Sequence, residues 1–175
     1  MGKQPEKIIS FDVYSGSEIF MGVADAELPN IEFMSETLSG AGIAGELDSP
    51  TIGHTSNMSV KIKFRTATKH ALELSAPKRH ELTFRASTQA RAISNGAALT
   101  TFPQKVMVAG TPKSVGLGKY ESGKMQDVPV ELACDYLKMW LDNKPVVEID
   151  KFNMIHKVGE IDYLQQVRKD LGREG

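Results

Sequence analysis

The glycines of the segment GAGIAG are the residues of this chain whose spacing most directly suggests chemistry. Gly40, Gly42 and Gly45 fit the G-x-G-x-x-G pattern, in which glycines let the backbone approach a dinucleotide pyrophosphate at the start of a helix. The surroundings do not fit this pattern, because the following segment contains Pro50 and Gly53 and cannot open a long helix. We therefore interpret the segment as part of a glycine-rich loop and not as a nucleotide site.

Other side chains that could catalyse a reaction or bind a metal do not form a recognisable set. None of the histidines stands at a metal-ligand spacing, and Cys134 lies on the apolar face of a predicted strand, where a buried, inert thiol is expected. Carboxylates four residues apart on that strand are about 13 Å from one another, too far for a glycosidase pair. We expect no enzyme activity, no metal and no cofactor. The histidines are His54, His70, His80 and His156, and the carboxylates are Asp127, Glu131 and Asp135.

Length and composition place the chain among ordinary globular proteins. Its 175 residues predict one domain that buries roughly 70% of its unfolded surface. Hydrophobic residues make up 41% of the chain and charged residues 25%. No apolar run approaches the ~18 residues of a membrane span. The N-terminal segment MGKQPEKIIS does not contain the apolar stretch of a signal peptide. A single cysteine cannot form an internal disulfide, so we expect folding in a cytoplasm without membrane insertion.

Charge is unevenly distributed along the chain although the net charge is only −1. Residues 8–60 contain eight acidic residues and no Lys or Arg, whereas residues 61–124 contain twelve Lys or Arg and three Glu. One interpretation is two solvated surfaces that happen to differ. The other is self-complementarity, in which an acidic face of one copy meets a basic face of the next and the contacts close into rings or extend into tubes.

Strict alternation of apolar and polar residues predicts a mainly β or α+β fold. Residues 58–66, 80–91 and 127–140 alternate with period two, and the last of these becomes apolar on both faces after Tyr136, which indicates a doubly buried strand or a bulge. We expect a single domain, residues 1–175, made of two packed sheets with one or two short helices. Further strands are expected at 7–14, 18–28, 30–38 and 100–112.

Helix and loop signals complete the expected organisation. A short helix is predicted from Thr68, its N-cap, to Pro77. A second is predicted over about 162–171, where Asp162 as N-cap and Gln165 form a capping box. The segment 39–57 is expected to be a mobile loop, because a loop of this length without structure of its own is usually functional or disordered.

Several segments of the chain resemble the major tail tube protein of contractile-tailed phages and of R-type bacteriocins, which are diffocin- or pyocin-like particles. The similarity is strong at both ends and weak between about 60 and 125. The segments are MGVADAELPNIEF, SGAGIAGELD and the C-terminal stretch from Lys144 to Gly172. The residues that carry it are Gly22, Val23, Ala24, Leu28, Pro29, Gly40, Ala41, Gly42, Gly45, Glu148, Ile149, Asp150, Asn153, Met154, Ile155, Lys157, Asp162, Arg168, Leu171 and Gly172, with Lys113, Gly116 and Gly118 in the weaker middle region.

The resemblance implies a β-sandwich in which one sheet joins those of five neighbours to form a continuous barrel around a channel. It further implies hexameric rings stacked through extended loops and a contractile sheath outside. A tape-measure protein or DNA would occupy the lumen, and a baseplate or tube initiator would start assembly. The particle, a phage tail or a bacteriocin, would be assembled in the bacterial cytoplasm. An inter-ring contact is then expected at Gly40, Gly42, Ile43, Gly45, Glu46 and Asp48.

The lining of such a channel can be predicted from charge. A tube that passes DNA should not hold it, and Lys and Arg bind phosphate backbones. We therefore expect the 18–28 and 30–38 strands to form a hairpin that lines much of the lumen and makes it acidic or neutral, with the segment 61–124 mainly outside or at subunit contacts. The alternative is that these carboxylates are ordinary outer-surface charges. The expected lining residues are Asp25, Glu27, Glu32, Glu36, Asp127, Glu131 and Asp135.

Two other functions stay open at this point. An Hcp-like secretion-system tube would share the fold and the assembly but carry effectors, and neighbouring genes would distinguish it. A small-ligand-binding β-barrel, or an enzyme using Gly40–Gly45, would not assemble into tubes, so the assembly state separates it from the others.

Overall fold

The computed structural model describes residues 2–19, 22–94 and 96–173, and the statements below concern these residues. They form twelve strands and two short helices. The strands are β1 (Lys3–Ser15), β2 (Glu18–Ile19), β3 (Val23–Glu27), β4 (Phe33–Ser39), β5 (Glu46–Thr55), β6 (Met58–Phe64), β7 (His80–Ala92), β8 (Ala98–Val115), β9 (Val128–Leu141), β10 (Lys144–Asp150), β11 (Ile155–Val158) and β12 (Ile161–Asp162). The helices are α1 (Lys69–Glu73) and α2 (Gln165–Asp170).

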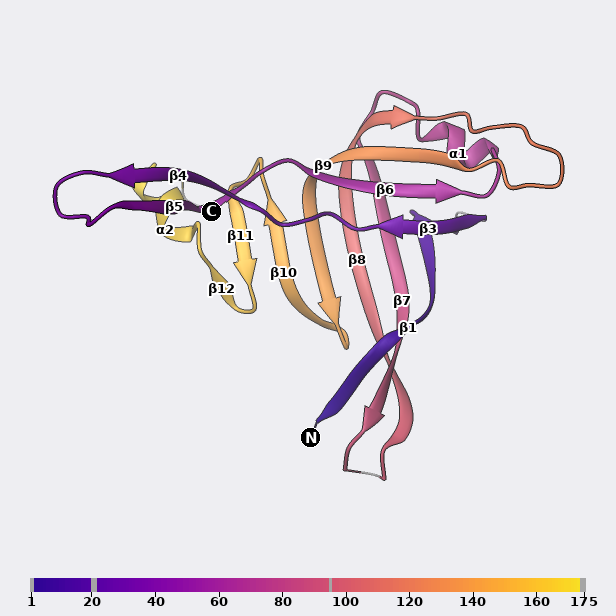
Figure 1. The fold of residues 1–175 in the computed structure, drawn as a ribbon, viewed down its shortest axis with the longest axis horizontal. Coiled ribbons are helices and arrows are strands. Elements are labelled where there is room, and N and C mark those ends of the chain that lie inside the picture. Colours follow the sequence, from indigo (N-terminus) through magenta and orange to yellow (C-terminus); the bar gives the residue numbers. More distant parts are fainter. Residues whose placement is uncertain (1, 20–21, 95, 174–175) are drawn as a thin grey trace.

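Ten of these strands belong to one antiparallel sheet that folds over itself. Its order is β12-β11-β10-β9-β8-β7-β1-β2, with β6 also paired to β9 and β3 to β6. We call β3, β6, residues 128–134 of β9 and residues 110–115 of β8 layer A, and β10, β7, β1 and the remaining parts of β8 and β9 layer B. The two layers cross steeply in Figure 1. The expected mainly β sandwich is confirmed, and its two packed layers are parts of a single sheet.

The layers are continuous because β8 and β9 bend from one into the other. Their register shifts at Ala109 and Gly110, opposite which Asp135 is an extra residue on β9. Such a bulge bends the strand that contains it. Gly110 lies at the bend, where a Cβ atom would be 2.1 Å from the carbonyl oxygen of Ala133. The bend therefore requires glycine at this position.

The core lies between the two layers and includes most of the residues that alternation predicted, together with Val13, Val106, Val108 and Ile149. Each of these side chains is at most 6% exposed. Complete burial of one aliphatic or aromatic side chain of this size contributes roughly 1.5–3 kcal/mol, so the alternating strands contribute a large part of the hydrophobic stabilisation. Ala71 and Leu74 at the end of α1 close one side of the core. The strand residues include Met58, Val60, Ile62, Phe64, Leu82, Phe84, Val128, Val130, Leu132 and Cys134.

The predicted helices are both present but shorter than expected. Thr68 caps α1 by accepting a hydrogen bond from the N–H of Ala71 at 3.2 Å, as predicted. The prediction that Asp162 caps the second helix is wrong, because Asp162 pairs with β11 as part of β12 and α2 begins only at Gln165. Leu164 is the N-cap of α2 and makes no side-chain cap hydrogen bond.

The expected loop over 39–57 is largely a strand. Residues 46–55 form β5, which pairs with β4, so that residues 33–55 make a projecting hairpin that we call the arm. Only residues 40–45 form its turn. The expected hairpin between 18–28 and 30–38 is also wrong, since β3 pairs with β6 and β4 pairs with β5.

Candidate assembly surfaces

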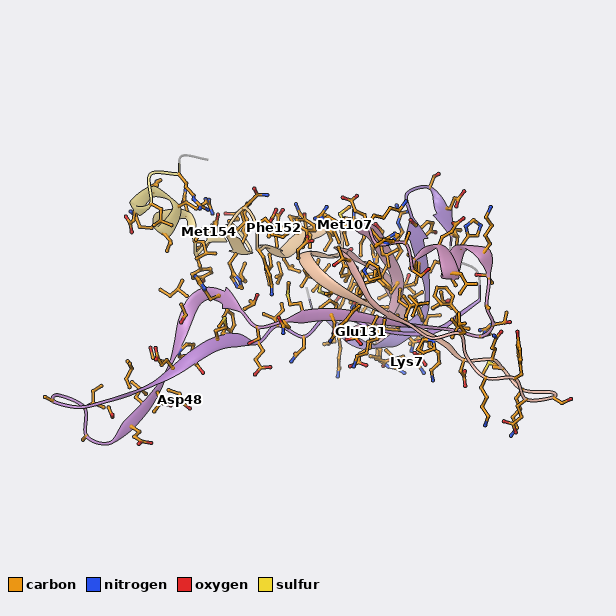
Figure 2. All side chains as sticks on the ribbon, turned by 90° about the horizontal axis from the view of Figure 1, so that it is seen from above. Lys7, Asp48, Met107, Glu131, Phe152 and Met154 are labelled. Carbon is orange, nitrogen blue, oxygen red and sulfur yellow. The ribbon has the colours of Figure 1, made fainter. Side chains whose placement is uncertain are left out.

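The tip of the arm brings together the residues that were expected to contact a neighbouring ring. In Figure 2 the arm, marked by Asp48, extends far beyond the body of the domain. The three glycines of its turn have φ values of 131°, 92° and 109°, a region that favours glycine. Every residue of the tip is exposed. These residues are Gly40, Gly42, Ile43, Gly45, Glu46 and Asp48.

The two faces of the arm differ in chemistry. Leu38 and Leu47 oppose each other across the strands and are 44% and 56% exposed. On the other face the hydroxyl of Thr37 donates to Asp48 at 3.0 Å. Residues 28–57 contain four carboxylates and no Lys or Arg, so the arm presents an apolar patch within an acidic surface. Such a patch on a projecting element indicates a contact with another molecule.

The base of the arm is held by the C-terminal part of the chain, which sequence reasoning did not predict. The ring centroids of Phe33 and His156 are 5.3 Å apart. Lys151 Nζ donates to the carbonyl oxygen of Ser56 at 2.8 Å. Gly53 packs directly on Leu164, since a Cβ at Gly53 would lie 2.5 Å from the Leu164 side chain. A glycine within a strand is the sequence signal that could have indicated this close approach.

Asp162 organises this C-terminal support. Its carboxylate accepts hydrogen bonds from the backbone N–H groups of His156 and Leu164. It also forms a salt bridge with Arg168, whose guanidinium donates a hydrogen bond to it at 2.8 Å. Burial would raise the pKa of Asp162, but these hydrogen bonds hold it below its ordinary value. Burial lowers the pKa of the His156 imidazole. Folding therefore favours the charged form of Asp162 and the neutral form of His156, which are the forms that dominate at neutral pH.

The outward face of layer A carries charges of both signs. Glu27 on β3 is opposite Lys61 on β6, and Lys61 is opposite Glu131 on β9. Lys113 Nζ on β8 lies 3.3 Å from Glu131. Asp25 is likewise opposite Lys63. Charges that are segregated along the sequence are thus interleaved in space on this face.

The carboxylates that were expected to line a channel do not all share one surface. Asp25, Glu27 and Glu131 are together on layer A. Glu32 and Glu36 belong to the arm and its connection. Asp127 lies in the turn before β9 with a φ of 55°, and Asp135 lies in the bulge, where Arg79 pairs with it at 2.8 Å.

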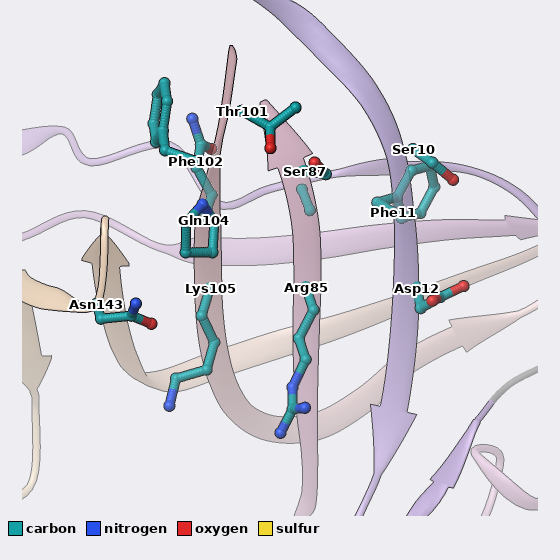
Figure 3. A pocket seen from close by; sticks show the side chains of 12 residues that line it. Ser10, Phe11, Asp12, Arg85, Ser87, Thr101, Phe102, Gln104, Lys105 and Asn143 are labelled. Atoms are coloured by element: carbon teal, nitrogen blue, oxygen red, sulfur yellow. The ribbon is translucent and has the colours of Figure 1, made fainter. Parts of the chain in front are cut away.

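Layer B has a shallow cleft of about 650 Å³ on its outward face, lined mainly from β1, β7 and β8. Figure 3 shows Arg85 and Lys105 extending in the same direction from adjacent strands. These cations are direct cross-strand neighbours, an unfavourable arrangement for like charges. Arg85 lies 4.8 Å from the Tyr14 ring centroid and Lys105 lies 3.9 Å from that of Trp140. Cation–π contacts and the carboxylate of Asp12, which is opposite Arg85 on β1, offset the repulsion. Two cations against one carboxylate leave the cleft with a small net positive charge.

The described part of the chain contains no group of three or more His, Cys, Asp or Glu residues arranged to hold a metal ion. Among the same residues no helix is long and apolar enough to cross a membrane. The glycines of GAGIAG lie in the hairpin turn between β4 and β5, and no helix follows them. Their geometry therefore differs from that of a dinucleotide-binding loop.

A projecting arm and a two-layered β domain are consistent with a subunit of an assembled tube, and comparison with known families supports this class. A sequence profile of the phage tail tube protein FII family matches residues 5–172. The chain belongs to this family.

One protein is similar in sequence over part of its length, and one solved structure is similar in fold. The tail tube protein of Escherichia phage P2 is 33% identical over 72 residues, which are 41% of this chain and 42% of that protein, so the match spans less than half of the relative. The fold is similar to a chain in the cryo-EM structure of an extracellular contractile injection system, the PVC sheath/tube terminator in its extended state. That similarity has a TM-score of 0.55 at 14% identity and covers 78% of this chain and 96% of the other.

Proposed function

We propose that this protein is the structural subunit of the inner tube of a contractile phage tail or R-type bacteriocin. Hexameric rings of the subunit stack into a tube that is driven through the envelope of a target cell. Family membership over residues 5–172 carries the proposal. The arm supports it, because an exposed hairpin with an apolar patch would otherwise be a liability in a free monomer.

The outward face of layer A lines the channel in this proposal. Asp25, Glu27 and Glu131 then face the lumen together with Lys61 and Lys63. Opposite charges on adjacent strands leave little net charge on this surface. A nucleic acid or a tape-measure protein would find neither a basic track that binds phosphates nor a strongly repulsive wall. This balance suits a conduit through which cargo must pass.

The arm makes the contact between stacked rings. Leu38 and Leu47 supply apolar area, and the surrounding carboxylates favour a basic surface on the neighbouring ring. Layer B then faces outward, where its cleft with Arg85 and Lys105 is available to the sheath protein. A tape-measure protein or DNA inside the tube, and a baseplate or tube initiator at its end, complete the partners.

Electron microscopy and sedimentation of the concentrated, purified protein test this function. We expect rings or tubes whose amount falls as salt rises, because exposed charges are screened beyond about 8–10 Å at moderate ionic strength. A protein that stays monomeric at every concentration, also in the presence of an initiator, would instead support the ligand-binding alternative. A secretion-system tube predicts the same assembly, and it is distinguished by neighbouring genes for a sheath, a tape measure and a baseplate.

The role of the arm is tested by two matched substitutions. Leu38→Asp places a charge in the apolar patch and should prevent stacking while rings still form. Ser39→Asp adds the same charge on the polar face of the same strand and should have a smaller effect. Equal effects of the two substitutions would refute a contact through the leucine face.

A further inference from the structure

Layer A has two edges whose backbone groups are unpaired within the described residues. β3 pairs with β6 on one side and has no partner on the other. The pairing of β8 with β7 ends at Gly110, so residues 111–115 of β8 adjoin β9 alone, with Lys113 as an extra residue between the paired Pro112 and Ser114. Unpaired strand edges are templates for pairing with another chain.

The two edges carry opposite charge. Across layer A the side chains run from Glu27 through Lys61 and Glu131 to Lys113, so that the sign alternates on successive strands. The β3 edge therefore ends in a negative charge and the β8 edge in a positive one. The side chain of Lys113 is 62% exposed, which leaves it able to reach a second carboxylate.

Strand direction is also compatible with pairing between the two edges. Each neighbouring pair within layer A is antiparallel, and layer A contains four strands, so β3 and β8 run in opposite directions. Copies related by rotation around one axis keep their strand directions. The β8 edge of one copy therefore meets the β3 edge of the next as an antiparallel pair.

We infer that Lys113 of one copy forms an ion pair with Asp25 or Glu27 of the next copy, beside an antiparallel β8–β3 pairing. This inference rests on the proposed tube function and names its lateral contact. The alternation of charge then continues around the whole ring without interruption. Pairing of two β3 edges or two β8 edges would place like charges together, so the pattern favours a closed head-to-tail ring over a symmetric dimer.

Engineered disulfides test the contact directly. A variant with Glu27→Cys and Lys113→Cys, and a second with Asp25→Cys and Lys113→Cys, are assembled and oxidised. Cys134 does not interfere, because it is buried and its pKa is raised to about 11. We expect disulfide-linked ladders up to the ring size in at least one double variant and none in the single variants. A control with Glu27→Cys and Lys157→Cys, the latter exposed on β11, should give no ladder.

Charge exchange tests the ion pair separately from the strand pairing. Lys113→Glu and Glu27→Lys should each weaken ring formation by about 5-fold or less per contact, as expected for exposed ion pairs, and the double variant should restore part of the loss. Thermal melting of the dilute monomer measures any change that these substitutions cause in the stability of a single copy.

The outcomes separate this inference from the proposed function. Wild-type tubes with no ladder in either double-cysteine variant would overturn the inference and leave the tube function standing. A wild-type protein that never assembles would overturn both. Disulfide-linked dimers without longer products would also contradict the inference, because a head-to-tail contact must continue from copy to copy.

Discussion

Replacement of Gly110 by alanine should destabilise the domain by opening the bend between the two layers. The new Cβ would lie 2.1 Å from the Ala133 carbonyl oxygen and 2.9 Å from the Cα of Cys134, both of which are backbone atoms. Relief would require β8 and β9 to separate by about 1 Å, and overpacking of this kind typically costs about 1–3 kcal/mol. Alanine recovers roughly 0.5–1 kcal/mol of the backbone entropy that glycine loses in a strand, so the net loss is about 0–2.5 kcal/mol. We expect the upper part of this range, because both clashes are with backbone atoms that cannot rotate away.

Urea unfolding and thermal melting of the dilute monomer, both followed by circular dichroism, measure this loss. For a domain of this size each kcal/mol lowers the melting temperature by roughly 2–4 °C. Thr111→Ala is a suitable control, because Thr111 is adjacent and exposed and its replacement should change stability by about 0.5 kcal/mol or less. An unchanged midpoint for Gly110→Ala would show that the strands can shift freely and would refute the argument for glycine at the bend.

Three further predictions concern the arm support and the core. Leu164→Ala should cost about 2–5 kcal/mol and speed hydrogen exchange in residues 33–55 more than in β6, whereas equal acceleration would mean that Leu164 does not hold the arm. Acid should loosen the same support, because both His156 and Asp162 have lowered pKa values in the fold. Their stabilisation is present at neutral pH and is lost as pH falls, below 6.5 for His156 and below 3.8 for Asp162. His156→Phe should remove the first of these steps from the pH profile of arm exchange, and an unchanged profile would contradict it. Burial raises the pKa of Cys134 to about 11, so thiol reagents at pH 8 should label it only in denaturant, and rapid labelling of the native protein would refute its burial.

Alternation predicted the core strands because each has one buried face. Residues 58–64 of β6 alternate between buried and partly or fully exposed positions over their whole length, and the first half of β9 does the same. A single buried face leaves a period-two signal in the sequence, and this signal does not depend on knowing the partner strand. The same reasoning predicted a change in β9 near Tyr136, where the structure has its bulge.

The arm and the C-terminal strands were not predictable in this way. β5 contains Pro50 and Gly53 and is mostly exposed, so its strand conformation depends on pairing with β4 and on the contact of Gly53 with Leu164 at the base of the arm. β10 is an exception, because its sequence carries a turn signal: Asp142 and Asn143 are residue types that tolerate positive φ, and an apolar run follows them. Both residues do have positive φ values in the structure, as in a tight hairpin turn. The mixed charge of layer A depends on β3 pairing with β6, which local sequence does not reveal.

The dependence of the arm on residues 151–164 has a consequence for synthesis. The ribosome makes the arm early, but Lys151, His156 and Leu164, which hold its base, emerge only after the core strands. A nascent chain therefore has no anchored arm, even when its sandwich has begun to fold. We therefore expect an incomplete chain to lack the anchored arm through which, in the proposed tube, rings would stack.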